Sequence, residues 1–271
     1  MDGGKVDKDW MDGSIDMGPC GAMRVGVYRP ANPLRPAPLV LHLHGGAFQG
    51  GCLDDGHFVS RLLADAGAVV LSADYPTGTS FAGTLKPLFA ALQSLETGRA
   101  RWADRKSKLF VAGEEAGGNL AAALALMARD LQAPKLAGQI LFSPMLDPDM
   151  ATCSIRNAAA GEAGCKWAEG WHSYLGTAGA LPHPYAAPAG VTRLAGVAPA
   201  LVLTAEDCPM HDESLRYAER LAASGIAVDC HCVATPTAWP DALSHPITAA
   251  PGWRAAIRDS VADFFAKTSG R

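Results

Sequence analysis

The stretch LFVAGEEAGGNLAAALAL, residues 109–126, predicts a strand, a sharp turn and a helix in succession. It opens with apolar and small residues that predict a buried strand, and the glycines that follow allow a sharp strand-to-helix turn. A helix is predicted over 116–130, because its apolar residues, among them Leu120 and Leu124, recur at the spacing of one helical face. The residue in the middle of the turn is Glu115.

Apolar runs and helical patterns alternate on both sides of this junction. The predicted strands are apolar almost throughout, which is typical of strands buried on both faces. They cover 24–28, 39–44, 68–74, 109–113, 138–142, 200–205 and 228–233. The helices predicted around them cover 57–66, 83–98, 116–130, 212–224 and 253–267. This alternation predicts an α/β fold with a mostly parallel central sheet and helices on both faces.

Residues 146–198 interrupt the alternation, because they are rich in Ala, Gly, Pro and aromatic residues and have little strand pattern. We interpret part of this segment, together with about residues 1–22, as a small helical cap over one end of the sheet. A chain of 271 residues is long enough to bury one proper core, so we predict a single domain over 1–271.

A second glycine-rich junction, HGGAF at 44–48, follows the strand predicted at 39–44. Glycines there let the backbone turn sharply and point N–H groups into a cleft, as an oxyanion hole requires. The first junction, GEEAG at 113–117, fits the pattern G-x-S-x-G, which holds a nucleophile on a strained turn. Glu115 stands where that pattern has serine.

Composition excludes several classes of protein. The chain has 23 Lys and Arg against 27 Asp and Glu, a net charge of −4, which argues against a general nucleic-acid binder. No apolar stretch approaches the roughly 20 residues of a membrane span, and the N-terminal stretch has no apolar signal segment, so we expect a cytoplasmic protein. The seven cysteines are scattered and odd in number, unlike a disulfide framework, and we predict no metal site and no cofactor.

Five motifs resemble, in the right order, the hormone-sensitive-lipase-like branch of the α/β-hydrolase fold, a family of carboxylesterases and lipases. They are HGGAF (44–48), Asp74-Tyr75, AGEEAGGNLAAALAL (112–126), LAGQILFSPMLD (136–147) and ALVLTAEDCPMHDES (200–214). The resemblance implies an α/β-hydrolase fold and a hydrolase by descent. It also implies an oxyanion hole formed by the amides of Gly45, Gly46 and Ala116, and a small apolar or ester-like ligand. Esterases of this branch are monomers or dimers, so a homodimer is compatible with it.

The resemblance fails at the catalytic positions. Glu115 replaces the family's serine. Pro209-Met210 sets the register of the family's D-P-L-x-D motif and places Cys208 at its catalytic aspartate. The family's histidine has no clear counterpart, because a gapless count ends on Ala238, and His245 fills the position only if the loop is longer.

Two hypotheses follow. In the first, the Glu115 carboxylate turns into the oxyanion hole and blocks it, which leaves a pseudoenzyme with a small-molecule pocket; losing the nucleophile alone costs about 10⁶-fold in turnover. In the second, Glu115 is itself a carboxylate nucleophile, as aspartate is in other branches of the fold, and His245 activates water. The acid that orients the histidine is then one of Asp207, Asp212 and Asp241. The sequence leaves both hypotheses open.

Overall fold

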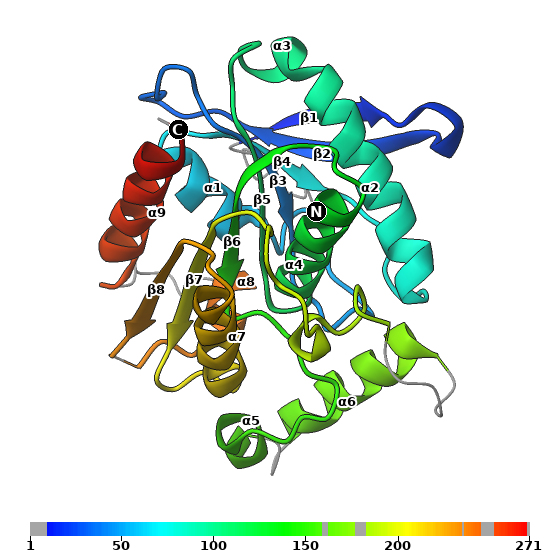
Figure 1. The fold of residues 1–271 in the computed structure, drawn as a ribbon, viewed down its shortest axis with the longest axis vertical. Coiled ribbons are helices and arrows are strands. Elements are labelled where there is room, and N and C mark those ends of the chain that lie inside the picture. The colour runs from blue at the N-terminus through cyan, green and yellow to red at the C-terminus, as the bar shows by residue number, and fades with distance from the viewer. Residues whose placement is uncertain (1–9, 159–161, 177–182, 235, 245–251, 270–271) are drawn as a thin grey trace, which may run out of the picture.

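Eight strands form one sheet in the computed structural model, in the order β1-β2-β4-β3-β5-β6-β7-β8 (Figure 1). The structure describes residues 10–158, 162–176, 183–234, 236–244 and 252–269. The strands are β1 Met11–Asp16, β2 Ala22–Tyr28, β3 Leu39–Leu43, β4 Val69–Ala73, β5 Leu109–Glu114, β6 Leu136–Phe142, β7 Ala200–Ala205 and β8 Val228–Val233. β2 pairs antiparallel with β1 and with β4, and the neighbouring pairs from β4 to β8 are parallel.

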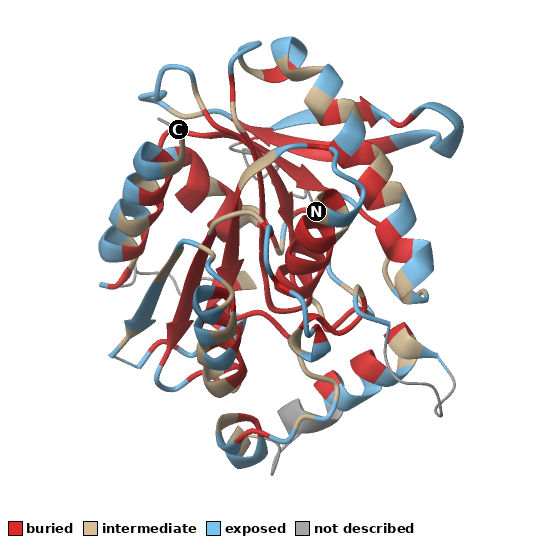
Figure 2. Cartoon of the chain, viewed as in Figure 1, coloured by how far each residue is buried: buried red, intermediate tan, exposed pale blue. Residues whose placement is uncertain are grey.

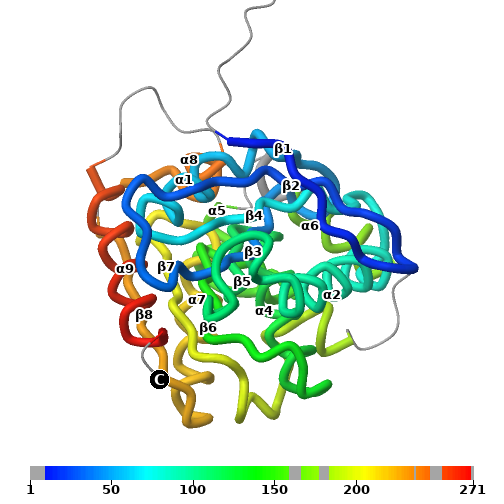
Figure 3. Tube along the Cα trace, turned by 90° about the horizontal axis from the view of Figure 1, so that it is seen from above, coloured from blue at the N-terminus to red at the C-terminus, as the bar shows by residue number. Residues whose placement is uncertain are grey.

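Helices cover both faces of the sheet. They are α1 His57–Asp65, α2 Phe81–Thr97, α3 Arg99–Trp102, α4 Glu115–Asp130, α5 Cys153–Ala158, α6 Glu162–Leu175, α7 His211–Ala223, α8 Asp241–Ser244 and α9 Arg254–Ser269. On one face α4 packs against β3, β5 and β6, with α2 and α7 beside it, while α1 and α9 pack together on the other face (Figure 3). None of the helices in the described ranges combines the length and the apolar character needed to cross a bilayer.

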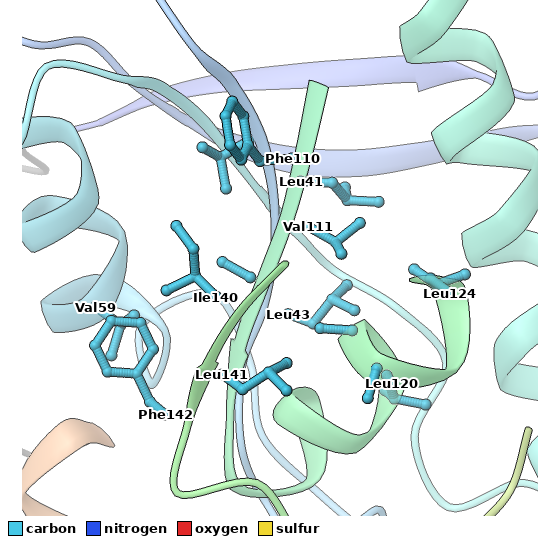
Figure 4. Packing of buried hydrophobic residues seen from close by; sticks show 14 of the residues in the cluster. Leu41, Leu43, Val59, Phe110, Val111, Leu120, Leu124, Ile140, Leu141 and Phe142 are labelled. Atoms are coloured by element: carbon cyan, nitrogen blue, oxygen red, sulfur yellow. The ribbon is translucent and has the colours of Figure 1, made fainter. Parts of the chain in front are cut away.

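The core lies on both faces of the central strands. Successive strand residues point to opposite faces, so Ile140 lies toward Val59 of α1 while Leu43 and Leu120 meet on the α4 side (Figure 4). The central strands are buried along their length, and exposure concentrates on the outer helix faces and on the edge strands β1 and β8 (Figure 2). A sheet buried on both faces explains why the predicted strands are apolar almost throughout.

The seven predicted strands and five predicted helices are confirmed, with boundary differences of a few residues. The cap prediction is wrong for Met11–Asp16, which forms edge strand β1 and pairs with β2 along its whole length. The sequence MDGSID does not predict a strand, because an edge strand that buries mainly Ile15 needs few apolar residues. Residues 1–9 lie outside the described ranges, and the single domain over 1–271 stays a prediction.

Segment 146–198 supplies α5 and α6, which lie at the end of the sheet where α4 begins (Figure 1). The first turn of α7 holds the start of this segment. Glu213 Oε2 accepts hydrogen bonds from the amides of Leu146 and Asp147, at 3.0 and 2.9 Å. The neighbouring Asp212 accepts the amide of Ser154 at 3.0 Å. Two adjacent acidic side chains therefore fix the cap segment to the α/β core.

Glu213 makes this anchor sensitive to pH. Burial raises the pKa of its carboxyl from 4.5 to about 8, although the two amides act in the opposite direction. A raised folded-state pKa gives stability that is complete below the unfolded value and is lost as pH rises through about 8. Between pH 5 and 9 we expect the free energy of unfolding of the wild type to fall by roughly a few kcal/mol more than that of Glu213→Gln. Urea unfolding at both pH values measures this, and parallel pH profiles of the two proteins would contradict it.

Candidate functional site

Glu115 lies on a strained turn between β5 and α4, at the carboxyl end of the sheet. Its φ is +51°, a left-handed value that is unfavourable for a residue with a side chain. The turn is tight because Gly117 approaches the backbone of β3 so closely that a Cβ there would overlap the Leu43 carbonyl. The glycines at 113 and 117 thus serve close packing, and the strain presents the Glu115 side chain at the strand ends.

The Glu115 carboxylate is almost fully buried, with 3% of the residue exposed, and donors surround both of its oxygens. Oε2 accepts the amides of Gly46 at 2.5 Å and Ala47 at 3.0 Å. Oε1 accepts the indole N–H of Trp167 at 2.7 Å and lies 3.7 Å from the Lys166 ammonium. Glu115 therefore joins the turn after β3 to α6 of the cap.

The amides on Glu115 are not the set expected from the sequence. Gly46 donates to it as expected, but the Gly45 amide donates to Glu114 Oε1 at 3.1 Å instead. The second donor is Ala47, because positive φ values of 122° at Gly46 and 49° at Ala47 turn consecutive amides toward the carboxylate. Ala116 lies buried beside Glu115 in the first turn of α4, and its part in an oxyanion hole stays a prediction.

Glu114 belongs to a buried polar chain under the same loop. Its Oε2 is 2.7 Å from His42 Nε2, and both residues are fully buried. His42 Nδ1 lies 2.9 Å from Ser60 Oγ and 3.1 Å from Ser72 Oγ. The residue types are those of a Ser–His–Glu triad, but the two ring nitrogens are exchanged relative to a triad, and Ser60 is fully buried, so a substrate has no access to it. Because Glu114 Oε1 also accepts the Gly45 amide, this hydrogen-bonded series of side chains holds the loop after β3.

His44 shapes the loop from its other side. Its Nδ1–H donates to the Gly45 carbonyl at 2.7 Å, and its ring stacks on Tyr75 with 4.4 Å between centroids. The Tyr75 hydroxyl donates to the His44 carbonyl at 2.6 Å. Burial lowers the pKa of His44, which favours a neutral ring. His44 is thus a structural residue of this loop.

Cys208 does not have the features of a reactive thiol. It is 1% exposed, and burial raises the pKa of its thiol to about 12. The carboxylate beside it belongs to Asp207, which accepts the amides of Thr237 at 2.6 Å and Ala238 at 3.0 Å. The loop that contains Thr237 and Ala238 is therefore fixed to the loop after β7.

The other candidates are dispersed. Asp212 accepts from His211 at 3.0 Å and anchors the cap, whereas Asp241 lies 3.6 Å from Lys166. His245 lies outside the described residues. The described part of the chain holds no group of three or more His, Cys, Asp or Glu side chains that could bind a metal ion.

A pocket of about 170 Å³ opens beside Glu115. It is lined by Gly45, Gly46, Gly51, Asp55, Glu115, Lys166, Pro240, Asp241 and Ser244. The pocket lies between the loop after β3, the cap helix α6 and α8, and its lining contains three carboxylates and one ammonium group. The pocket is therefore small and has charged groups of both signs in its lining.

Three of these functional contacts were not predicted from the sequence. The Ala47 amide depends on backbone angles, which no motif displays. Trp167 and Lys166 lie 52 and 51 positions after Glu115, in a helix with no catalytic motif. Asp207, in contrast, is one of the acids that the sequence offers as a partner for the histidine, and it directly precedes Cys208.

Comparison with known proteins gives consistent matches. Residues 40–237 match a family model described as alpha/beta hydrolase fold. The chain is similar to Esterase LipI of Mycobacterium tuberculosis, with 34% identity over 82% of this chain and 71% of that protein. It is also similar to Carboxylesterase NlhH of the same species, with 32% identity over 76% of this chain and 67% of that protein.

Solved structures give the same result. A thermostable esterase from Pseudomonas putida superposes with a TM-score of 0.83 at 28% identity, over 97% of this chain and 85% of that one. A bacterial heroin esterase superposes with a TM-score of 0.81 at 26% identity, over 94% of this chain and 84% of that one. Both matches confirm the fold predicted from the five motifs.

Proposed function

This chain belongs to the alpha/beta hydrolase fold family and is related to carboxylesterases, and from that premise we propose that it is a catalytically impaired member that keeps a small-molecule pocket. One observation carries the proposal. The Glu115 carboxylate accepts the Gly46 and Ala47 amides, so the donors that would stabilise a substrate oxyanion already bind an anion of the protein itself.

The remaining triad positions support the same conclusion. Acyl transfer needs a nucleophile, a histidine that deprotonates it and an acid that orients the histidine. Glu115 replaces the serine, and Cys208 at the aspartate position is a buried thiol whose pKa is raised to about 12. Ala238 occupies the position that a gapless count assigns to the histidine. The changes at 115 and 208 each remove a separate part of the mechanism, and the gapless count removes the histidine as well, whereas a longer loop would place His245 there.

The contacts of Glu115 disfavour the second hypothesis, in which it attacks the substrate. A carboxylate nucleophile needs an oxygen free to approach carbon, and both Glu115 oxygens accept hydrogen bonds from the protein. The Lys166 ammonium, 3.7 Å from Oε1, stabilises the negative charge further. Attack would require breaking these interactions first.

The pocket narrows the class of ligand. Its volume of about 170 Å³ is below the roughly 300 to 1,000 Å³ of sites for drug-sized molecules. Its lining includes Lys166, Asp241 and Ser244. We therefore favour a small apolar or ester-like molecule over a drug-sized one.

Ester hydrolysis tests the proposal. We expect wild-type protein to hydrolyse p-nitrophenyl butyrate no faster than the Glu115→Gln variant, because neither has an activated nucleophile. Glu115→Ser alone should recover little activity, since the other two positions remain changed. Release of p-nitrophenol gives the rates, and mass spectrometry after incubation with a haloalkane or an epoxide should show Glu115 unmodified.

Two results would reject the proposal. The first is turnover by the wild type that Glu115→Gln abolishes, which would assign the carboxylate a catalytic role. The second is an adduct on Glu115 after incubation with a haloalkane or an epoxide, which would establish the carboxylate nucleophile.

A further inference from the structure

A larger cavity, of about 550 Å³, lies at the end of the sheet opposite Glu115. Leu136 and Val228 at the starts of β6 and β8 line it, and so do the end of α9 and the α2–α3 junction. Glu115 follows the carboxyl end of β5, so the two hollows are separated by the length of the strands. This cavity is in the size range of sites that bind small molecules, about 300 to 1,000 Å³.

Apolar side chains form one part of its wall. Leu136, Ala137, Pro199, Ala227, Val228 and Phe264 contribute to it. Phe264 is 2% exposed and contacts Phe110 edge-on, with 6.3 Å between ring centroids, so this wall is continuous with the core. Such a wall suits a hydrocarbon group.

The rest of the lining is charged, with an excess of cations. The basic residues are Arg99, Lys108, Lys135 and Lys267, and the acidic ones are Glu96 and Asp229. This excess is opposite in sign to the chain's net charge of −4. The cavity therefore attracts anions although the whole protein does not.

Both acidic residues already have partners in the protein. Glu96 Oε1 accepts the Lys135 amide at 2.9 Å and lies 3.4 Å from Arg99 Nη2. Asp229 lies 2.9 Å from the Lys267 ammonium. The Lys135 ammonium forms no ion pair with any residue in the described ranges. Lys135 thus presents a positive charge next to the apolar wall.

We propose that this cavity binds an amphipathic carboxylate, with its anionic head at Lys135 and its hydrocarbon chain along Leu136 and Phe264. A second hollow of about 400 Å³ shares Lys135, Leu136 and Pro199 with the cavity, so Lys135 borders both hollows. This site is independent of Glu115 and of the function proposed above.

Isothermal titration calorimetry with decanoate, below its micelle concentration, tests the site. We expect saturable binding to one site, and Lys135→Glu should weaken it by about 10-fold or more, because an attraction becomes a repulsion. Lys86→Glu makes the same charge change on an exposed part of α2, ten residues before Glu96, and should change affinity by less than about 2-fold. Decyltrimethylammonium should not bind.

Several outcomes would overturn the proposal. They are no binding of decanoate, equal binding of decanol and decanoate, and an affinity that Lys135→Glu leaves unchanged. Filling the cavity with Ala137→Phe provides a second check, since it should weaken decanoate binding without reversing a charge. Decanoate binding that changes with Glu115→Ser but not with Lys135→Glu would place the ligand at the other pocket. Failure here leaves the ester-hydrolysis test unaffected.

Discussion

A triple variant, Glu115→Ser with Cys208→Asp and Ala238→His, should hydrolyse p-nitrophenyl butyrate at least about 100-fold faster than the wild type. The scaffold keeps the strained turn at position 115 and the Gly46 and Ala47 amides that Glu115 now occupies. Serine at 115 would leave these amides available to an oxyanion. The expected gain is well below the about 10⁶-fold effect of an evolved triad, because reconstructed geometry is imperfect.

The structure supports position 238 for the new histidine. Asp207, which precedes Cys208, accepts the Ala238 amide at 3.0 Å, so positions 208 and 238 lie on neighbouring loops. Pro240, from the same loop as Ala238, and Asp241, the first residue of α8, line the pocket with Glu115. Ala238 has a φ of 57°, a region in which histidine is found more often than most residues. The side chain at 238 is exposed, so a larger residue has room.

Double variants are the controls for this reconstruction. Triad residues act as a unit, so each of the three doubles should stay near the wild-type rate. Urea unfolding checks that the variants remain folded, especially because Cys208→Asp introduces a carboxylate at a site that is 1% exposed. Equal activity of Glu115→Ser alone and of the triple variant would contradict the assignment of position 238.

Much of the fold could be predicted because its signals are local. Strands such as β5 and β7 are continuous apolar runs, and the glycines at the two junctions are required by close backbone contacts. β1 could not be predicted in the same way, because its place is set by pairing with β2 and not by its own polar sequence. Whether an edge segment forms a strand depends on the neighbouring strand it pairs with, and the segment's own residues carry no information about that neighbour.

The site was less predictable than the fold. An anionic side chain at position 115 near amides follows from the two junction motifs. Which amides it meets depends on the left-handed backbone at Gly46 and Ala47, and that shifts the donor pair by one residue. The Trp167 contact depends on how α6 packs across the strand ends, which the segment's composition does not specify.

Removing one partner of the buried His42–Glu114 pair should be among the most destabilising single substitutions in this protein. We expect Glu114→Ala to lower the free energy of unfolding by about 3–5 kcal/mol. The substitution leaves the His42 imidazole and the Gly45 amide without an acceptor, in a region with no exposure to solvent. Glu114→Gln should lower the free energy of unfolding by less, because the amide oxygen of the glutamine can still accept one of the two hydrogen bonds. Guanidinium unfolding monitored by circular dichroism gives the values.

Two comparisons separate the pair from a general effect of removing a glutamate. Glu219→Ala, at an exposed position of α7, should stay within about 0.5 kcal/mol of the wild type. His42→Ala combined with Glu114→Ala should cost clearly less than the sum of the single variants, because once either partner is gone the other has already lost its contact. Additive losses would mean that each residue acts alone. In that case Glu114 would hold the loop through the Gly45 amide only, and His42 would be a packing residue of β3.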